Sequence, residues 1–139
     1  MRRKFIAMAL FGCAAAVGVI ATAAPAYALD AGAYRDNFNG RSCDALVYVS
    51  DTTSSGKVEA FGGFSCPSNV KLVGHLTVVL YRNGTQVCSH GHGYNLVSTD
   101  NEQCAITDNS GNQKWKARLR ITTPDTTGGV NIVTGEIST

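Results

Sequence analysis

Residues 113–123 read QKWKARLRITT, a segment in which apolar and basic side chains alternate. Successive side chains of a β-strand point to opposite faces, so this alternation predicts a strand with one buried and one solvated face. We expect Trp115 to lie in the core. The apolar set is Trp115, Ala117, Leu119 and Ile121.

Similar short segments, rich in β-branched and aromatic residues, fill the chain from residue 43 onward. In the strand expected over Lys71–Arg82, Leu76, Val78 and Leu80 share one face. Asn83-Gly84 favours a two-residue hairpin turn, because both central positions of that turn need a positive φ. Its return strand is expected over Thr85–His90.

The later strands are weaker in the sequence. We expect a strand over Tyr94–Ser98, a polar loop over Thr99–Glu102, a short strand near Gln103–Thr107 and a last strand over Val130–Ile137. No stretch shows helical periodicity over a dozen positions. The pattern predicts an all-β, antiparallel two-sheet sandwich of seven or eight strands, resembling the immunoglobulin fold, with a small closed barrel as the alternative.

The N-terminus carries the three parts of a secretory signal peptide. Basic residues at positions 2–4 precede the apolar stretch Phe5–Ala24, and Ala26 and Ala28 fit a cleavage site after residue 28. A retained anchor is the alternative. We therefore predict a signal peptide over 1–28, an N-terminal extension over 29–42, a β-sandwich domain over 43–139 and a secreted protein.

Length and charge exclude several classes of function. A chain of 139 residues is too short for a doubly wound nucleotide-binding enzyme or a (β/α)₈ barrel. Without Arg2, Arg3 and Lys4, 9 of the 12 basic residues face 10 acidic ones. Net charge thus gives no reason to expect nucleic acid as a partner, or a membrane once the signal peptide is cleaved.

Four cysteines follow the predicted cleavage site, and an even number in a short exported chain indicates two disulfides. Their spacing does not fit a zinc finger. If residues 43–50 and 57–66 form a hairpin whose partners sum to 109, Cys43 faces Cys66. We therefore predict Cys43–Cys66 and, by elimination, Cys88–Cys104, with an interlaced pairing as the alternative.

The order of these features resembles that of small, mostly uncharacterised exported proteins of actinobacteria. The resemblance covers most of residues 43–121. It rests on the Ala-rich leader, Cys66-Pro67, the segment LYRNG at 80–84, the pair Cys88 and Cys104, and SGNQKW at 110–115. It implies a compact secreted two-disulfide β-sandwich and transfers no active site.

The basic face of residues 113–123 is the first candidate binding site. Its four side chains lie about 7 Å apart along the strand and would suit a cell-wall polymer or another anionic glycan. A solvated outer face, or an edge strand protected by charge, is the alternative. The four residues are Lys114, Lys116, Arg118 and Arg120.

His90 and His92 are the only metal-like pair, because both imidazoles would point to one side of a strand. A metal site would need a third ligand such as Asp100 or Glu102. Two solvated histidines in a polar loop are the favoured interpretation. We predict no metal and no cofactor.

Tyr48 and Phe61 would be cross-strand partners on the outer face of the first hairpin. We expect the second sheet or the N-terminal segment, with Tyr34 and Phe38, to cover them; otherwise they form an exposed binding patch. Tyr94 is a further candidate platform for stacking on sugars.

No catalytic motif occurs, and disulfide formation would remove the thiol nucleophiles. The leading hypothesis is a non-catalytic module that binds a cell-wall polymer, a glycan or an extracellular protein. One alternative is an inhibitor of an extracellular hydrolase that presents residues 91–100 as a loop. The other is a small secreted hydrolase with His90 or His92 as its base.

Overall fold

A computed structural model describes residues 30–38, 40–51, 56–124 and 129–139. The predicted signal peptide lies outside these residues, and so do residues 52–55 between the two segments of the expected first hairpin. No helix long and apolar enough to cross a membrane occurs in the described ranges. The strands are β1 (Asp30–Phe38), β2 (Cys43–Ser50), β3 (Lys57–Ser65), β4 (Leu72–Arg82), β5 (Thr85–Val97), β6 (Thr99–Thr107), β7 (Lys114–Thr122), β8 (Val130–Val133) and β9 (Ile137–Ser138).

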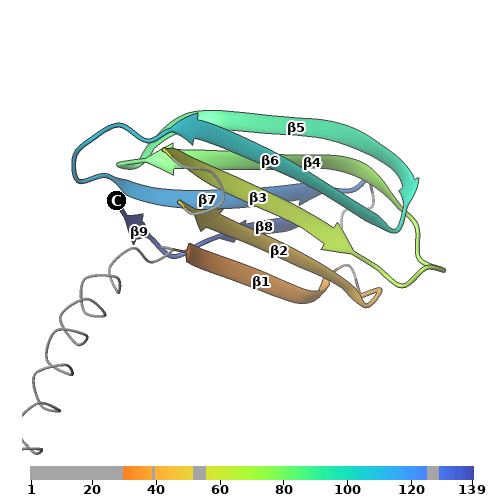
Figure 1. Cartoon of the computed structure of the whole chain (residues 1–139). Coiled ribbons are helices and arrows are strands. Elements are labelled where there is room, and N and C mark those ends of the chain that lie inside the picture. Colours follow the sequence, from red (N-terminus) through yellow and green to blue (C-terminus); the bar gives the residue numbers. More distant parts are fainter. Residues whose placement is uncertain (1–29, 39, 52–55, 125–128) are drawn as a thin grey trace, which may run out of the picture.

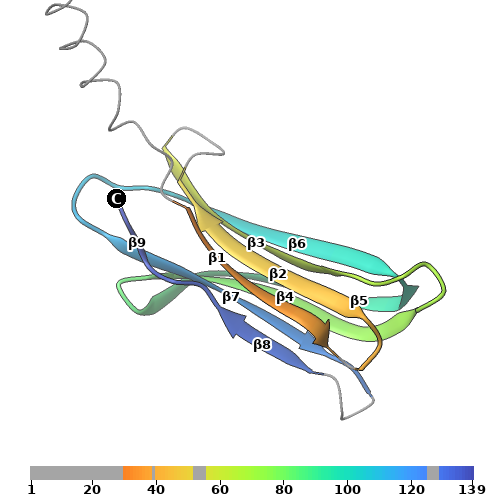
Figure 2. The ribbon, with the colours of Figure 1, turned by 90° about the horizontal axis from the view of Figure 1, so that it is seen from below.

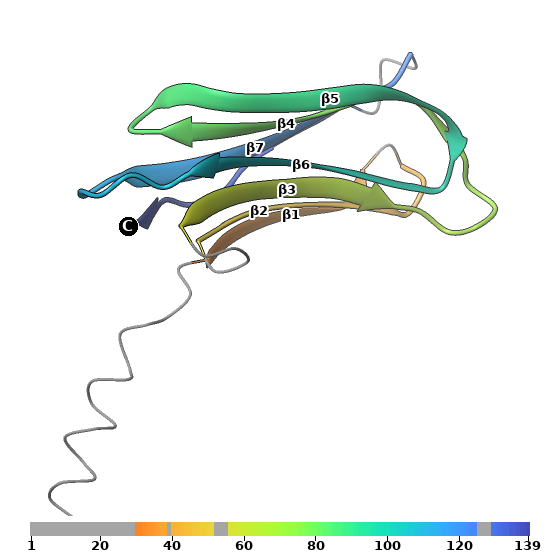
Figure 3. The same cartoon turned by 45° about the horizontal axis from the view of Figure 1, so that its top comes forward.

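The strands form two antiparallel sheets that lie face to face (Figures 1 and 3). The first sheet has the order β1-β2-β3-β6. The second sheet has the order β5-β4-β7-β8, and β9 also pairs with β7. The prediction of an all-β, two-sheet antiparallel fold is confirmed, and the arrangement is two separate sheets rather than one closed barrel.

The core lies between the sheets and comes from alternate residues of the strands. The predicted inward faces of β4 and β7 are confirmed, including Trp115. Burying a leucine, valine or isoleucine side chain contributes about 1.5–3 kcal/mol, so these positions supply much of the stabilising free energy. The fully buried residues on these two strands are Leu76, Val78, Leu80, Trp115, Ala117, Leu119 and Ile121.

The hairpin of β2 and β3 has the expected register, in which paired residues sum to 109. Val47 faces Gly62 and Val49 faces Ala60, all on the buried face. The same register brings Cys43 to Cys66 beyond the end of β3, and the predicted disulfide between them is confirmed.

The β4–β5 hairpin turns at Asn83-Gly84, with φ values of 50° and 80°. The strands that follow are longer than predicted. β5 continues to Val97, and β6 begins at Thr99, so the polar loop expected over Thr99–Glu102 is wrong. The physical reason is that β6 pairs with β3 along its whole length, from Thr99 opposite Ser65 to Thr107 opposite Lys57.

The segment expected to be an N-terminal extension contributes an edge strand to the first sheet. β1 pairs with β2 from Asp30 to Phe38. Ala31 and Ala33 pack against the core, and Phe38 is buried in it. At this edge of the sandwich β1 lies near β8 of the second sheet (Figure 2).

The second predicted disulfide, Cys88–Cys104, is also confirmed, and the interlaced pairing is wrong. Cys88 belongs to β5, at the edge of the second sheet, and Cys104 to β6, at the edge of the first. This bond therefore joins the two sheets covalently. We call the line along which β5 meets β6 the seam.

Replacing both seam cysteines (Cys88→Ser with Cys104→Ser) should lower the free energy of unfolding by about 3 kcal/mol, because the unfolded chain regains the freedom of the closed loop. Urea unfolding measures the change. The matched variant Cys43→Ser with Cys66→Ser should lose a similar amount, since its loop is of similar size. Losses below about 1 kcal/mol in both variants would contradict this assignment.

Candidate functional site

Polar side chains point into the sandwich along the seam. His92 lies opposite the fully buried Leu76, so alternation turns His92, and with it His90, toward the other sheet. On β6, Asp100 and Glu102 share a face with the buried Cys104 and point toward β5. Along the seam, two histidines of the second sheet therefore face two carboxylates of the first sheet.

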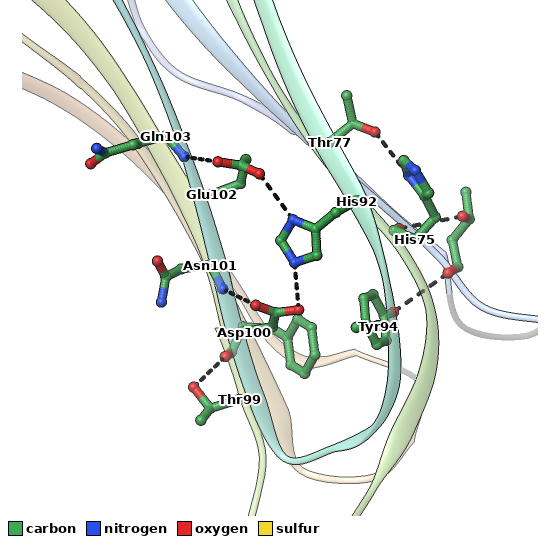
Figure 4. Close-up of polar contacts among 11 residues, drawn as sticks. His75, Thr77, His92, Tyr94, Thr99, Asp100, Asn101, Glu102 and Gln103 are labelled. Carbon is green, nitrogen blue, oxygen red and sulfur yellow. Dashed lines mark hydrogen bonds and ion pairs between the residues drawn. The ribbon is translucent and has the colours of Figure 1, made fainter.

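His92 is held between the two carboxylates (Figure 4). Its Nδ1 lies 2.9 Å from Glu102 Oε2, and its Nε2 lies 2.9 Å from Asp100 Oδ2. The carboxylates stand on opposite sides of the ring, so one protonated imidazole can donate a hydrogen bond to each. His92 therefore clamps β5 to β6 beside the disulfide.

This arrangement shifts two pKa values in opposite directions. The hydrogen bond to Glu102, followed by that to Asp100, raises the pKa of His92 above 6.5. The backbone N–H of Gln103, followed by the His92 ring, lowers the pKa of Glu102 below 4.5. Both shifts favour the charged pair.

His90 does not join His92 in one ligand set. Its Nδ1 contacts the carbonyl oxygen of Gln103 at 2.9 Å. The close group of ligand-type atoms at this point combines His90 with Cys88 and Cys104 within 4.8 Å, but the two sulfurs are bonded to each other. Neither cysteine therefore offers a thiolate to a metal.

The expectation that Tyr94 is an exposed sugar platform is wrong. Tyr94 is buried, its ring lies 5.0 Å from that of Phe64, and its hydroxyl donates to the carbonyl oxygen of Thr122 at 3.4 Å. Burial raises its pKa to about 12. The register with Gly74 explains this, because it turns Tyr94 to the inner face of β5.

Residues 91–100, expected as a loop, belong mostly to β5 and β6. Leu96 is exposed there and has a φ of 51°, where the β4–β5 register shifts. A shift of this kind is typical of a β-bulge. The expectation of a protruding loop is therefore wrong.

The outer face of the first sheet carries a groove of about 320 Å³. The side chains that matter for its chemistry are Tyr34, Asp44, Leu46, Phe61, Ser65 and Thr99. The second sheet packs on the opposite face, so the expectation that it covers this face is wrong. Of the N-terminal segment, Phe38 enters the core, whereas Tyr34 stands beside the groove with 59% of its surface exposed. We call this site the aromatic groove.

Gly63 leaves the floor of the aromatic groove without a side chain. It lies between Leu46 of β2 and Asn101 of β6. A Cβ at this position would come within 3.0 Å of Asn101 and closer still to the carbonyl oxygen of Asp100. A glycine here therefore allows β3 and β6 to approach and opens the surface above them.

Contacts with neighbouring residues fix the two aromatic side chains that line the groove, Tyr34 and Phe61. Tyr48 and Phe61 face each other across β2 and β3, as predicted, with ring centroids 5.3 Å apart and planes 25° apart. The Tyr34 hydroxyl donates a hydrogen bond to the Asp44 carboxylate, which raises the pKa of Tyr34. Asp44 also accepts the backbone N–H of Asn37 at 3.2 Å. These contacts hold the rings in place before any ligand binds.

The four basic residues of β7 lie on the outer face of the second sheet, as alternation predicts. They are not equally free. Lys114 and Lys116 approach Glu136 at 3.3 Å and 3.7 Å, and Arg118 Nε donates to Asn131 Oδ1 at 2.7 Å. Only part of the stripe is therefore left without a partner.

Sequence reasoning missed the contribution of Tyr34 and Asp44 to a groove. Residues 30–38 lack a run of large apolar residues, and their inward positions before Phe38 are small alanines, so no strong strand signal placed Tyr34 beside Leu46. The usable signal was the register of the first hairpin, which sets Asp44 and Leu46 on the outer face.

Comparisons with known proteins give no relative. No family model, curated protein or solved structure matches the chain.

The His92 clamp predicts a pH-dependent stability. Because folding raises the pKa of His92, its contribution to the free energy of unfolding is complete below pH 6.5 and is lost as pH rises through the folded-state pKa. Because folding lowers the pKa of Glu102, its contribution to the free energy of unfolding is complete above pH 4.5 and is lost as pH falls through the folded-state pKa. The clamp contribution should therefore be largest between pH 4.5 and 6.5, and His92→Gln should lower Tm in that window by about 3 °C.

Calorimetry across pH 4–9 on both proteins tests the clamp. His90→Gln is the matched control, because His90 contacts a backbone carbonyl and not a carboxylate. It should retain the pH dependence of the wild type. Equal Tm differences between wild type and His92→Gln at every pH would contradict the clamp.

Proposed function

We propose that this chain is a secreted, non-catalytic glycan-binding module, and that the aromatic groove is its binding site. The observation that carries the proposal is the 320 Å³ groove, in which the exposed ring of Tyr34 and the half-buried ring of Phe61 stand beside a carboxylate and hydroxyl groups. This volume lies at the small end of the range for ligand pockets, which suits a short glycan segment.

The chemistry of the aromatic groove matches a neutral sugar. A sugar ring offers a C–H face that packs on aromatic carbon and a rim of hydroxyls that need hydrogen-bond partners. Tyr34 and Phe61 supply the first, whereas Asp44, Ser65 and Thr99 supply the second. No lysine or arginine lines the groove, and the carboxylate of Asp44 disfavours an anion.

The contacts of the histidines give less support to the hydrolase alternative. Both ring nitrogens of His92 face carboxylates, and His90 contacts a backbone carbonyl oxygen. The inhibitor alternative relied on an exposed loop over residues 91–100, and these residues belong mostly to β5 and β6. We therefore favour binding over catalysis or inhibition.

Secretion and the actinobacterial resemblance belong to the same proposal. Two intramolecular disulfides are compatible with an oxidising, extracellular location. The scaffold is immunoglobulin-like in the broad sense of two antiparallel sheets around a buried tryptophan. Its strand order differs from the A-B-E-D and C-F-G sheets of the immunoglobulin constant domain, so we propose a likeness of architecture and not of topology.

Calorimetric titration with soluble oligosaccharides of N-acetylglucosamine and of glucose, and retention on insoluble cell walls, test the proposal. Tyr34→Ala should weaken binding about fivefold to tenfold, because it removes a ring face and the partner of Asp44. Binding should persist at high salt, since a neutral ligand is not held by charge.

Tyr81→Ala is the matched control, because Tyr81 is a partly buried tyrosine of the second sheet, away from the aromatic groove. It lies on β4, opposite Lys116 of β7. It should bind glycans as the wild type does. Absence of binding to every glycan tested, or equal loss in Tyr34→Ala and Tyr81→Ala, would refute the aromatic groove as the site.

A further inference from the structure

A second hollow lies on the outer face of the second sheet, on the side of the molecule opposite the aromatic groove. It has a volume of about 260 Å³ and is lined by His75, Thr77, Arg120 and Thr122. His75 lies opposite Thr122, and Thr77 opposite Arg120, on the neighbouring strands β4 and β7. The strand register alone therefore gathers these four side chains, which we call the anion hollow.

Arg120 differs from the other basic residues of β7 in its contacts. Lys114 and Lys116 both form ion pairs with Glu136, and Arg118 donates a hydrogen bond to Asn131. Within the described part of the chain, no carboxylate pairs with the Arg120 guanidinium. Among the described residues, the positive charge at the anion hollow thus has no carboxylate partner.

The other lining groups are arranged to offer a second donor. Thr77 Oγ1 lies 3.2 Å from His75 Nδ1. A Thr77 hydroxyl that donates to Nδ1 leaves the ring proton on Nε2, where it can be donated to a ligand. Thr122 Oγ1 donates to the His75 carbonyl oxygen at 3.4 Å and so ties the two strands beneath the ring.

A glycine on β5 makes room for this arrangement. A Cβ at Gly91 would lie 2.8 Å from Thr77 Oγ1 and 3.1 Å from His75 Cε1, and closer still to the Leu76 carbonyl oxygen. Any larger residue at this position would displace the Thr77–His75 pair. By contrast, a Cβ at Gly93, opposite His75, would have its nearest neighbour at 3.7 Å.

We infer that the anion hollow binds a phosphate or sulfate group. Its lining offers a guanidinium, an imidazole and two hydroxyls, and none of these described lining residues is a carboxylate. A guanidinium fork matches two oxygens of a tetrahedral oxyanion, and charge-assisted bonds of this kind are the strong ones. Arg118 and Lys116 continue from Arg120 in steps of about 7 Å, so the group can belong to a free anion or to a repeating anionic polymer.

Titration of the purified, isotope-labelled chain with inorganic phosphate, at constant ionic strength set with sodium chloride, tests the inference by NMR. Saturable shifts should appear at His75, Thr77 and Arg120. Arg120→Gln should weaken phosphate binding about tenfold, because it removes the guanidinium that lines the site. Gly93→Val, which adds bulk opposite His75 without changing charge, should weaken binding as well.

Arg35→Gln is the matched control, because Arg35 is an exposed arginine on β1 of the other sheet. It should bind phosphate as the wild type does. An absence of saturable shifts, or phosphate binding by Arg120→Gln equal to that of the wild type, would overturn the inference.

A parallel titration with linear polyphosphate distinguishes the source of the anion. If polyphosphate binds more tightly per phosphate group than inorganic phosphate does, and Arg118→Gln abolishes this gain, the ligand is a polymer. If the two bind equally per phosphate group, the ligand is a free anion. Glycan binding at the aromatic groove should be unchanged in Arg120→Gln, so the failure of either site leaves the other to be tested.

Discussion

The structure depends on the burial of alternate side chains between two sheets. Because successive side chains of a strand point to opposite faces, each residue that fills the core places its two chain neighbours on the surface. The buried tryptophan, alanine, leucine and isoleucine of β7 thereby set four basic residues on the outer face of the second sheet. The buried valines of β2 likewise set Leu46 and Tyr48 on the outer face of the first. A register slip of one residue would turn the apolar side chains of the core to the surface and the polar surface side chains to the core.

The two edges of the sandwich are closed in different ways. At the β1–β8 edge, small alanines and Phe38 of β1 pack against the core. At the seam, a disulfide and a charged histidine clamp replace apolar packing. Polar groups are tolerated there because each has a partner: His92 meets two carboxylates, and Glu102 also accepts the backbone N–H of Gln103 at 3.0 Å. The seam is therefore stabilising without being apolar.

The sequence predicted those parts of the fold in which alternation is clean. The register of the first hairpin, both disulfides and the inner faces of β4 and β7 could be derived from it. It failed along β5 and β6, because four of their inward positions are polar and their pairing with β4 and β3 is a long-range property. The four are His90, His92, Asp100 and Glu102. The sequence also failed for β1, whose inward residues before Phe38 are small alanines that do not mark a strand. For the same reason the aromatic groove, which joins Tyr34 of β1 to β2, β3 and β6, could not be assembled from the sequence, although Tyr48 and Phe61 could be paired.

The two outer faces have opposite chemistry on one rigid frame. The first sheet exposes rings and a carboxylate, and the second exposes an arginine beside an imidazole. Hydroxyl-radical footprinting with mass spectrometry tests directly which side chains lie outside. This arrangement predicts rapid modification of Tyr34 and Leu46 in the native protein, with Trp115 and Tyr94 protected until unfolding. Modification of Trp115 or Tyr94 as fast as Tyr34, or a protected Tyr34, would contradict it.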